Sequence, residues 1–159
     1  MHKRRASHHR IQSGECSTER DRMPTALVID DSPIMRKSLR AILERAGCQV
    51  VGEGGSGDDV LPLYERFAPT IVTMDIVMPG KDGLTAATEL LQRHPNAVIV
   101  MCSSLTSRDK ILACQKAGVA HYLLKPFQPE KATAVLQYVL SRINRPQTGA
   151  HAVVRAGER

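Results

Sequence analysis

The chain has 159 residues, of which 42% are hydrophobic and 3% aromatic with no Trp, so we expect one domain with an aliphatic core. No apolar run approaches the ~20 residues that cross a bilayer, and no apolar segment follows the charged first residues as in a signal peptide, which predicts a cytoplasmic protein without a membrane span. The net charge of +6 lies mainly at the ends of the chain: residues 1–22 hold six Lys/Arg against three Asp/Glu, and residues 145–159 hold three against one. The middle is nearly neutral, which argues against a nucleic-acid-binding domain.

Two flexible tails are predicted around a folded domain at residues 23–144. The first, residues 1–22, is rich in Arg, His and Ser and nearly devoid of apolar residues, so it cannot bury enough surface to offset the entropy of ordering. The second, residues 145–159, contains one Pro and two Gly. Because regular patterning begins at Met23, a translation start at that residue is an alternative interpretation of the basic segment before it.

Between the tails, five short apolar runs alternate with five helical patterns. Strands are expected at residues 25–29, 49–52, 70–74, 97–102 and 120–124, and helices at residues 33–46, 58–67, 84–94, 107–117 and 129–143. Ser32 is the predicted cap of the first helix, with Pro33 at its first position and Gly47 as its stop. Apolar strands that alternate with amphipathic helices predict an α/β fold with a parallel sheet covered on both faces, and the least apolar strand, the second, is expected at an edge.

The four cysteines are scattered along the chain without a C-x-x-C pair. They are Cys16, Cys48, Cys102 and Cys114, and the last three lie in apolar segments. We therefore expect buried, reduced thiols rather than disulfides, and no ligand spacing supports a zinc site.

Polar residues follow the predicted strands at the edge where ligands bind in such sheets. Asp30 and Asp31 follow the first strand, Asp75 the third, Ser103 the fourth and Lys125 the fifth. Three clustered carboxylates repel one another unless a cation joins them. Their oxygen ligands suit Mg²⁺, so the sequence predicts a magnesium site at this edge.

The same group of residues could receive a phosphoryl group. Asp75 would be the nucleophile that attacks phosphorus in line. The charge of the phosphoryl oxygens would be neutralised by Mg²⁺ on Asp30 and Asp31, while Lys125 and Ser103 contact the remaining oxygens.

Several pieces of the sequence occur together in a specific order and spacing. They are Val28-Ile29-Asp30-Asp31-Ser32, Met74-Asp75-Ile76-Val77-Met78-Pro79, Asp82-Gly83, Ser103 and Tyr122-Leu123-Leu124-Lys125-Pro126-Phe127. In these pieces, and over about residues 24–143, the chain resembles the receiver domain of two-component response regulators. We expect no output domain, and on that expectation the chain resembles the single-domain chemotaxis regulators of this family. The resemblance implies a doubly wound, flavodoxin-like (βα)5 fold with strand order 2-1-3-4-5.

The resemblance also implies roles for individual residues. Asp75 would be the phosphorylated residue, with Lys125 beside it, and the backbone carbonyl of Val77 would complete the Mg²⁺ site of the three carboxylates. Ser103 and Tyr122 would form the switch pair. The peptide bond before Pro126 would be cis.

The implied function is a phosphorylation-controlled signalling switch, not an enzyme, with self-phosphotransfer and autodephosphorylation chemistry. A sensor histidine kinase would supply the phosphoryl group, and the fourth helix, fifth strand and fifth helix would form a protein-binding face, with contacts at Leu105, Lys110, Lys116 and Tyr122. The chain is expected to be a monomer. The downstream partner would be a flagellar motor switch protein, a phosphotransfer protein of a phosphorelay, or a partner outside motility. Val77 and Leu105 stand where polar residues often influence the hydrolytic water, which leaves the phosphoryl lifetime open.

A glycine-rich stretch favours a rival class, the dinucleotide-binding oxidoreductases. Residues 52–57 read Gly-Glu-Gly-Gly-Ser-Gly, which matches G-x-G-x-x-G between a strand and a helix. The match follows the second strand and not the first, however, and the next helix lacks the small residues that close packing needs. The domain also has no room for a substrate half, so we do not favour this interpretation.

Overall fold

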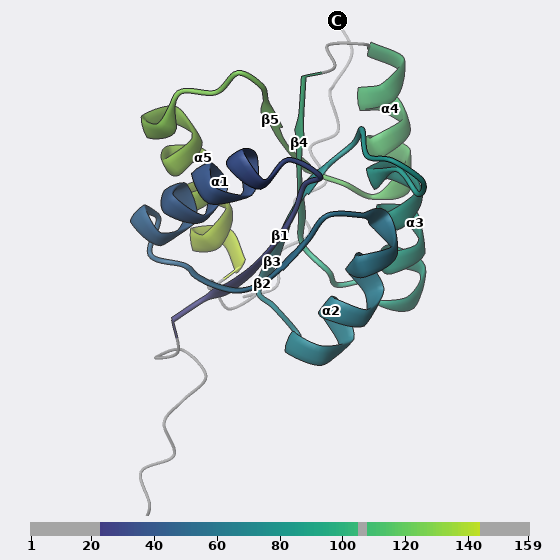
Figure 1. The fold of residues 1–159 in the computed structure, drawn as a ribbon, viewed down its shortest axis with the longest axis horizontal. Helices are drawn as coiled ribbons and strands as arrows, with labels where there is room; N and C mark the ends of the chain where they lie inside the picture. Colours follow the sequence, from purple (N-terminus) through teal and green to yellow (C-terminus); the bar gives the residue numbers. More distant parts are fainter. Residues whose placement is uncertain (1–22, 105–107, 144–159) are drawn as a thin grey trace, which may run out of the picture.

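The computed structural model of the chain describes residues 23–104 and 108–143 (Figure 1). The strands are β1 (Thr25–Ile29), β2 (Gln49–Gly54), β3 (Ile71–Asp75), β4 (Ile99–Ser103) and β5 (His121–Leu124). The helices are α1 (Pro33–Arg45), α2 (Val60–Phe67), α3 (Gly83–Arg93), α4 (Arg108–Ala117) and α5 (Pro129–Ile143), and a short 3-10 helix, η2 (Gly57–Asp59), precedes α2. The predictions for the two tails and for a contact at Leu105 fall outside the described residues.

The five strands form one parallel sheet in the order β2-β1-β3-β4-β5. This confirms the predicted order and the edge position of the second strand. Helices α1 and α5 cover one face of the sheet, and α2, α3 and α4 cover the other (Figure 1). In the part of the chain that the structure describes, no helix has the length and apolar character that crossing a membrane requires.

The core lies on both faces of the sheet because side chains of a strand alternate between the two faces. In β1, Ala26 and Val28 belong to the cluster that includes Leu136 of α5, whereas Leu27 packs in the cluster that includes Leu90 of α3. Every residue of β3 and β4 is buried. These central strands are mostly apolar, as expected for a sheet with helices on both faces, and their buried polar residues are Thr73, Asp75 and Ser103.

The cysteines in the described part of the chain are buried, free thiols, which confirms the interpretation of their apolar surroundings. They are Cys48, Cys102 and Cys114. Burial raises the pKa of Cys102 to about 12 and that of Cys48 to about 11, so both thiols remain protonated at neutral pH.

The ends of the predicted elements differ from the observed ones by two residues at most. The largest change at the edge of the sheet is that β2 continues to Gly54, where it still pairs with Ile29 of β1. Its glycines have a packing reason, since a Cβ at Gly52 would lie 2.8 Å from Leu27 Cδ2 and one at Gly54 2.8 Å from Asp59 Cβ. The glycine-rich stretch thus belongs partly to the edge strand, which argues further against a dinucleotide site.

Two caps define how helices begin near the carboxyl edge of the sheet. The Ser32 hydroxyl accepts a hydrogen bond from the Met35 N–H at 3.3 Å and caps α1. The predicted second helix begins instead with η2, because Ser56 and Asp59 form a capping box. Asp59 Oδ2 accepts bonds from the Gly55 and Ser56 N–H groups at 2.9 and 3.0 Å. These bonds favour a tight first turn before the α-helical residues.

Candidate functional site

The predicted acidic residues come together at the carboxyl edge of the sheet. Asp30 follows β1 directly and Asp75 is the last residue of β3, and these two strands are neighbours. One carboxylate oxygen from each of Asp30, Asp31 and Asp75 lies within 4.8 Å of the others. Asp30 is fully buried and Asp75 is 8% exposed, whereas Asp31 is exposed to solvent. The cluster therefore has a buried floor and one carboxylate at its opening.

Lys125 joins this cluster from the end of β5. Its ammonium donates to Asp30 Oδ2 at 2.6 Å and lies 3.2 Å from Asp75 Oδ2. Its backbone N–H bonds the carbonyl of Ser103 at 2.8 Å, and the Lys125–Pro126 peptide bond is cis. One cation thus bridges two of three carboxylates, and the cluster keeps a net negative charge when all three are ionised.

Burial and pairing act in opposite directions on the charged groups of the site. Burial raises the pKa of the Asp75 carboxyl above its ordinary value, although Lys125 acts to lower it. Burial lowers the pKa of the Lys125 ammonium, but its bond to Asp30 and the charge of Asp75 outweigh this, so the pKa is raised overall. Asp75 is therefore a carboxylate that a second cation would stabilise further. The close carboxylate oxygens and the remaining negative charge fit Mg²⁺, a hard cation that takes oxygen ligands.

The loop between β3 and α3 packs directly against the Asp75 backbone. The Val77 N–H donates to Asp75 Oδ1 at 3.4 Å, and the Gly83 N–H donates to the Ile76 carbonyl at 2.8 Å. A Cβ at Gly83 would lie 1.9 Å from the Asp75 carbonyl oxygen, so no other residue fits there without moving the loop. The Asp82-Gly83 pair found in the sequence therefore seats this loop on the Asp75 backbone.

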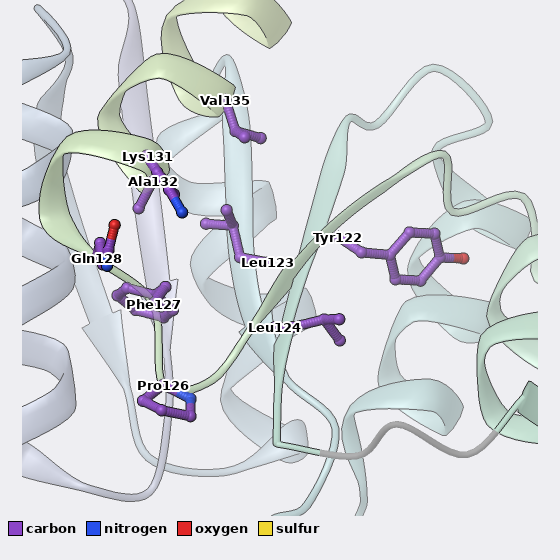
Figure 2. Close-up of a pocket in the computed structure, with 9 residues that line it drawn as sticks. All are labelled: Tyr122, Leu123, Leu124, Pro126, Phe127, Gln128, Lys131, Ala132 and Val135. Atoms are coloured by element: carbon purple, nitrogen blue, oxygen red, sulfur yellow. The ribbon is translucent and has the colours of Figure 1, made fainter.

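The two predicted switch residues lie on β4 and β5. Ser103 is the last residue of β4 and is 4% exposed at the same edge as the carboxylates. Tyr122 lies at the side of the sheet that α4 covers, and its hydroxyl bonds the carbonyls of Val119 at 2.9 Å and Ile111 at 3.4 Å. Figure 2 shows its ring directed away from Lys131, Ala132 and Val135 of α5. Tyr122 therefore connects β5 to the backbone of α4.

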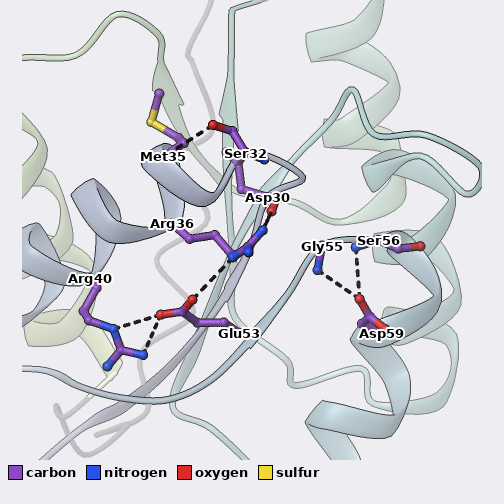
Figure 3. A network of polar contacts seen from close by, with 9 residues as sticks. All are labelled: Asp30, Ser32, Met35, Arg36, Arg40, Glu53, Gly55, Ser56 and Asp59. Carbon is purple, nitrogen blue, oxygen red and sulfur yellow. Dashed lines mark hydrogen bonds and ion pairs between the residues drawn. The ribbon is translucent and has the colours of Figure 1, made fainter.

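Arg36 is a neighbour of the site that the sequence did not predict. Its Nη1 donates to the backbone carbonyl of Asp30 at 2.7 Å, and its Nε pairs with Glu53 of β2 at 3.3 Å (Figure 3). Arg40 holds the other Glu53 oxygen at 2.5 and 2.8 Å. The sequence pattern that could have indicated this contact is the spacing of Arg36 and Arg40, which lie one helical turn apart in α1 and so share one face of the helix. That face meets Glu53 of the neighbouring strand β2.

Comparisons with known proteins agree with this geometry. A family model described as the response regulator receiver domain matches residues 26–137. Chemotaxis protein CheY of Thermotoga maritima is 37% identical over 113 residues, which cover 71% of this chain and 94% of the relative. CheY of Bacillus subtilis is 34% identical over 115 residues, which cover 72% of this chain and 96% of the relative.

A solved structure gives the same result for the fold. The crystal structure of the CheX–CheY–BeF3–Mg complex from Borrelia burgdorferi contains a chain that matches with a TM-score of 0.70 at 26% identity. The match covers 73% of this chain and 88% of that one. The sheet order and the family match agree, and this chain therefore belongs to the response regulator receiver domain family of two-component signalling.

Proposed function

We propose that Asp75 accepts a phosphoryl group from the phosphohistidine of a sensor histidine kinase. The observation that carries this proposal is the grouping of the Asp30, Asp31 and Asp75 oxygens within 4.8 Å, with the Lys125 ammonium on two of the three carboxylates. A nucleophile, a cation-binding set and a fixed ammonium at one sheet edge are what phosphoryl transfer to a carboxylate needs.

In the proposed transfer, an oxygen of Asp75 forms a bond to phosphorus while the bond from phosphorus to the histidine nitrogen breaks. The electron pair of that bond returns to the imidazole, and Asp75 becomes an acyl phosphate. Lys125 already lies 3.2 Å from Asp75 Oδ2 and would pair with a phosphoryl oxygen. Asp30, Asp31, Asp75 and the Val77 carbonyl would hold Mg²⁺, which neutralises charge on the phosphoryl group when bound. Water would later attack phosphorus, the bond from phosphorus to the Asp75 oxygen would break, and the release of inorganic phosphate would restore the Asp75 carboxylate.

The proposed output is a changed protein-binding face on α4, β5 and α5. Ser103 would move toward the new phosphoryl oxygens, and Tyr122 would change its contacts with α4. Within the described residues, α4 fully buries a single side chain, Cys114, so a shift of this helix disrupts little core. Lys110 and Lys116 are exposed on the same helix, where a partner could contact them.

The proposed setting is a cytoplasmic monomer that regulates chemotaxis. It is supported by the relatives named CheY, which this chain matches along nearly their whole length. A flagellar motor switch protein is then the proposed target. A phosphotransfer protein of a phosphorelay is the second candidate, because it would use the same acceptor chemistry.

The acceptor is tested by incubating the protein with acetyl phosphate and Mg²⁺ and measuring the intact mass. Wild type should gain one phosphate, Asp75→Asn should gain none, and Asp109→Asn, which changes an exposed carboxylate on α4, should behave as wild type. Labelling should also disappear when EDTA removes Mg²⁺. Equal labelling of Asp75→Asn would show that another residue is the acceptor.

The partner is tested by comparing motor switch proteins with histidine phosphotransfer proteins in binding to the phosphorylated and unphosphorylated forms. Phosphorylation-dependent binding to a motor switch protein is expected. Binding to a phosphotransfer protein alone would replace the chemotaxis proposal by the phosphorelay.

A further inference from the structure

Lys81 makes two ion pairs near the tip of the β3–α3 loop. Its ammonium lies 2.7 Å from Glu89 Oε2 on α3 and 3.1 Å from Asp58 Oδ1 on η2. The three residues belong to three different elements, and the Lys81 side chain is only 27% exposed. Lys81 thus ties the loop that follows Asp75 to η2 and to α3.

The backbone of Lys81 is also seated against a glycine. A Cβ at Gly57 would lie 2.4 Å from the Lys81 carbonyl oxygen, so only glycine allows this approach. The backbone on both sides of Gly57 is held by hydrogen bonds. The Asp59 carboxylate accepts from the Gly55 and Ser56 N–H groups (Figure 3), and the Ser56 hydroxyl accepts from the Asp58 N–H. The glycine-rich stretch that resembled a dinucleotide site therefore supports the neighbouring loop.

The base of the same β3–α3 loop packs against Asp75, the proposed phosphoryl acceptor. Gly83 bonds the Ile76 carbonyl and lies directly against the backbone of Asp75. Val77, whose N–H bonds Asp75 Oδ1, lies between this base and the Lys81 tip. The position of Val77 relative to the acidic cluster is thus fixed by contacts at the base of the loop and by the contacts of Lys81 near its tip.

We propose that Lys81 and Gly57 are positioning residues for the magnesium site, because they clamp the β3–α3 loop against η2 and α3. Neither residue contacts the metal in this scheme. The inference rests on the proposed function, since it takes the acidic cluster with the Val77 carbonyl as the Mg²⁺ site.

Charge gives this inference a test with a definite sign. Lys81 is a cation, so its removal makes the surroundings of the magnesium site more negative. If Coulomb attraction acted alone, Mg²⁺ binding would become stronger. Release of the clamp has the opposite effect, because a looser loop presents the Val77 carbonyl less often. Gly57→Ala changes no charge at all and should act only through the displaced Lys81 backbone.

The experiment is a calorimetric titration of the full chain with Mg²⁺ in the absence of a phosphoryl donor. Lys81→Met and Gly57→Ala should each weaken Mg²⁺ binding by about three- to tenfold, below the ~10- to 100-fold typical of groups that bond a metal ligand directly. Lys81→Arg can keep both ion pairs and should restore most of the affinity. Arg93→Met is the matched control, because Arg93 is a paired cation at the far end of the same helix α3, where its partner is Glu65 of α2. This variant should bind Mg²⁺ as wild type does.

Thermal unfolding without Mg²⁺ verifies that each variant is folded, and Lys81→Gln replaces Lys81→Met if the latter is not. Equal or tighter Mg²⁺ binding by folded Lys81→Met would overturn the clamp while the proposed function stands. Failure of wild type to bind Mg²⁺ at all would overturn both the clamp and the proposed metal site.

Discussion

At the scale of single residues, the site combines a buried acidic floor with partners drawn from distant parts of the chain. Asp30 receives bonds from the Ser32 N–H, from Arg36 on its carbonyl and from Lys125 on its carboxylate. Each contact satisfies a group that is costly to bury alone. Burial raises the pKa of the Asp75 carboxyl in the same surroundings, and the pairing with Lys125 lowers it by less.

Tyr122 gives a pH-dependent prediction at this scale. Burial raises its pKa to about 12, whereas the phenol of the unfolded chain ionises near 10.0. Above pH ~10 the unfolded chain therefore binds fewer protons than the folded one, so the free energy of unfolding of wild type falls as pH rises toward ~12. In Tyr122→Phe the free energy of unfolding does not fall in this way, because there is no phenol to ionise at this position. The variant also lacks the hydrogen bonds of the hydroxyl to the Val119 and Ile111 carbonyls, worth ~1 kcal/mol.

We thus expect Tyr122→Phe to be less stable than wild type at neutral pH, and the deficit to narrow as pH rises above ~10. Urea unfolding of both proteins at a series of pH values measures it. Tyr138→Phe changes an exposed phenol and serves as the control. A deficit for Tyr122→Phe that stays constant with pH would contradict the effect of burial on this phenol.

At the scale of elements, the start of α1 connects helix stability to the site. The Ser32 hydroxyl caps the Met35 N–H, while the Ser32 backbone N–H bonds Asp30 Oδ1 at 2.9 Å. Ser32→Ala removes only the cap, so we expect a loss of ~1 kcal/mol in the free energy of unfolding. Urea unfolding should show a lower midpoint with an unchanged slope, and Ser32→Thr should restore most of the loss. An unchanged Ser32→Ala midpoint would show that water replaces the hydroxyl without cost.

At the scale of the whole molecule, the helices α4 and α5 on opposite faces of the sheet differ in how firmly they are held. Among the described residues, α5 fully buries four side chains and α4 one. A change at the acidic edge should therefore move α4 and β5 before it disturbs α1 or β2.

Hydrogen exchange with and without Mg²⁺ and beryllofluoride, a phosphoryl mimic, tests this expectation. Exchange rates should change most in residues 108–124 and least in residues 25–54, except at the carboxylates themselves. Asp75→Asn should show no such change. A uniform change along the chain would indicate general stabilisation by the ligand and no directed switch.

Much of the fold and of the candidate site could be predicted from the sequence, because the relevant signals are local. Apolar runs, the Ser32 cap and the carboxylates after the first and third strands all follow from short-range patterns. In a parallel sheet, strand ends share one edge, so Asp30, Asp75 and Lys125 could be placed together without coordinates. The family pieces, such as Lys125-Pro126, added the strand order.

The tertiary structure alone decided contacts that depend on how closely distant backbones approach. It showed that Lys125 pairs more closely with Asp30 than with Asp75, across 95 residues of sequence. It also showed that Arg36 supports the Asp30 carbonyl and that Gly57 faces the backbone of Lys81. The same glycine pattern occurs in loops that bind phosphate and in loops that pack against another backbone. A glycine in the sequence shows only that a side chain is absent, and not whether a ligand or a neighbouring backbone occupies that space.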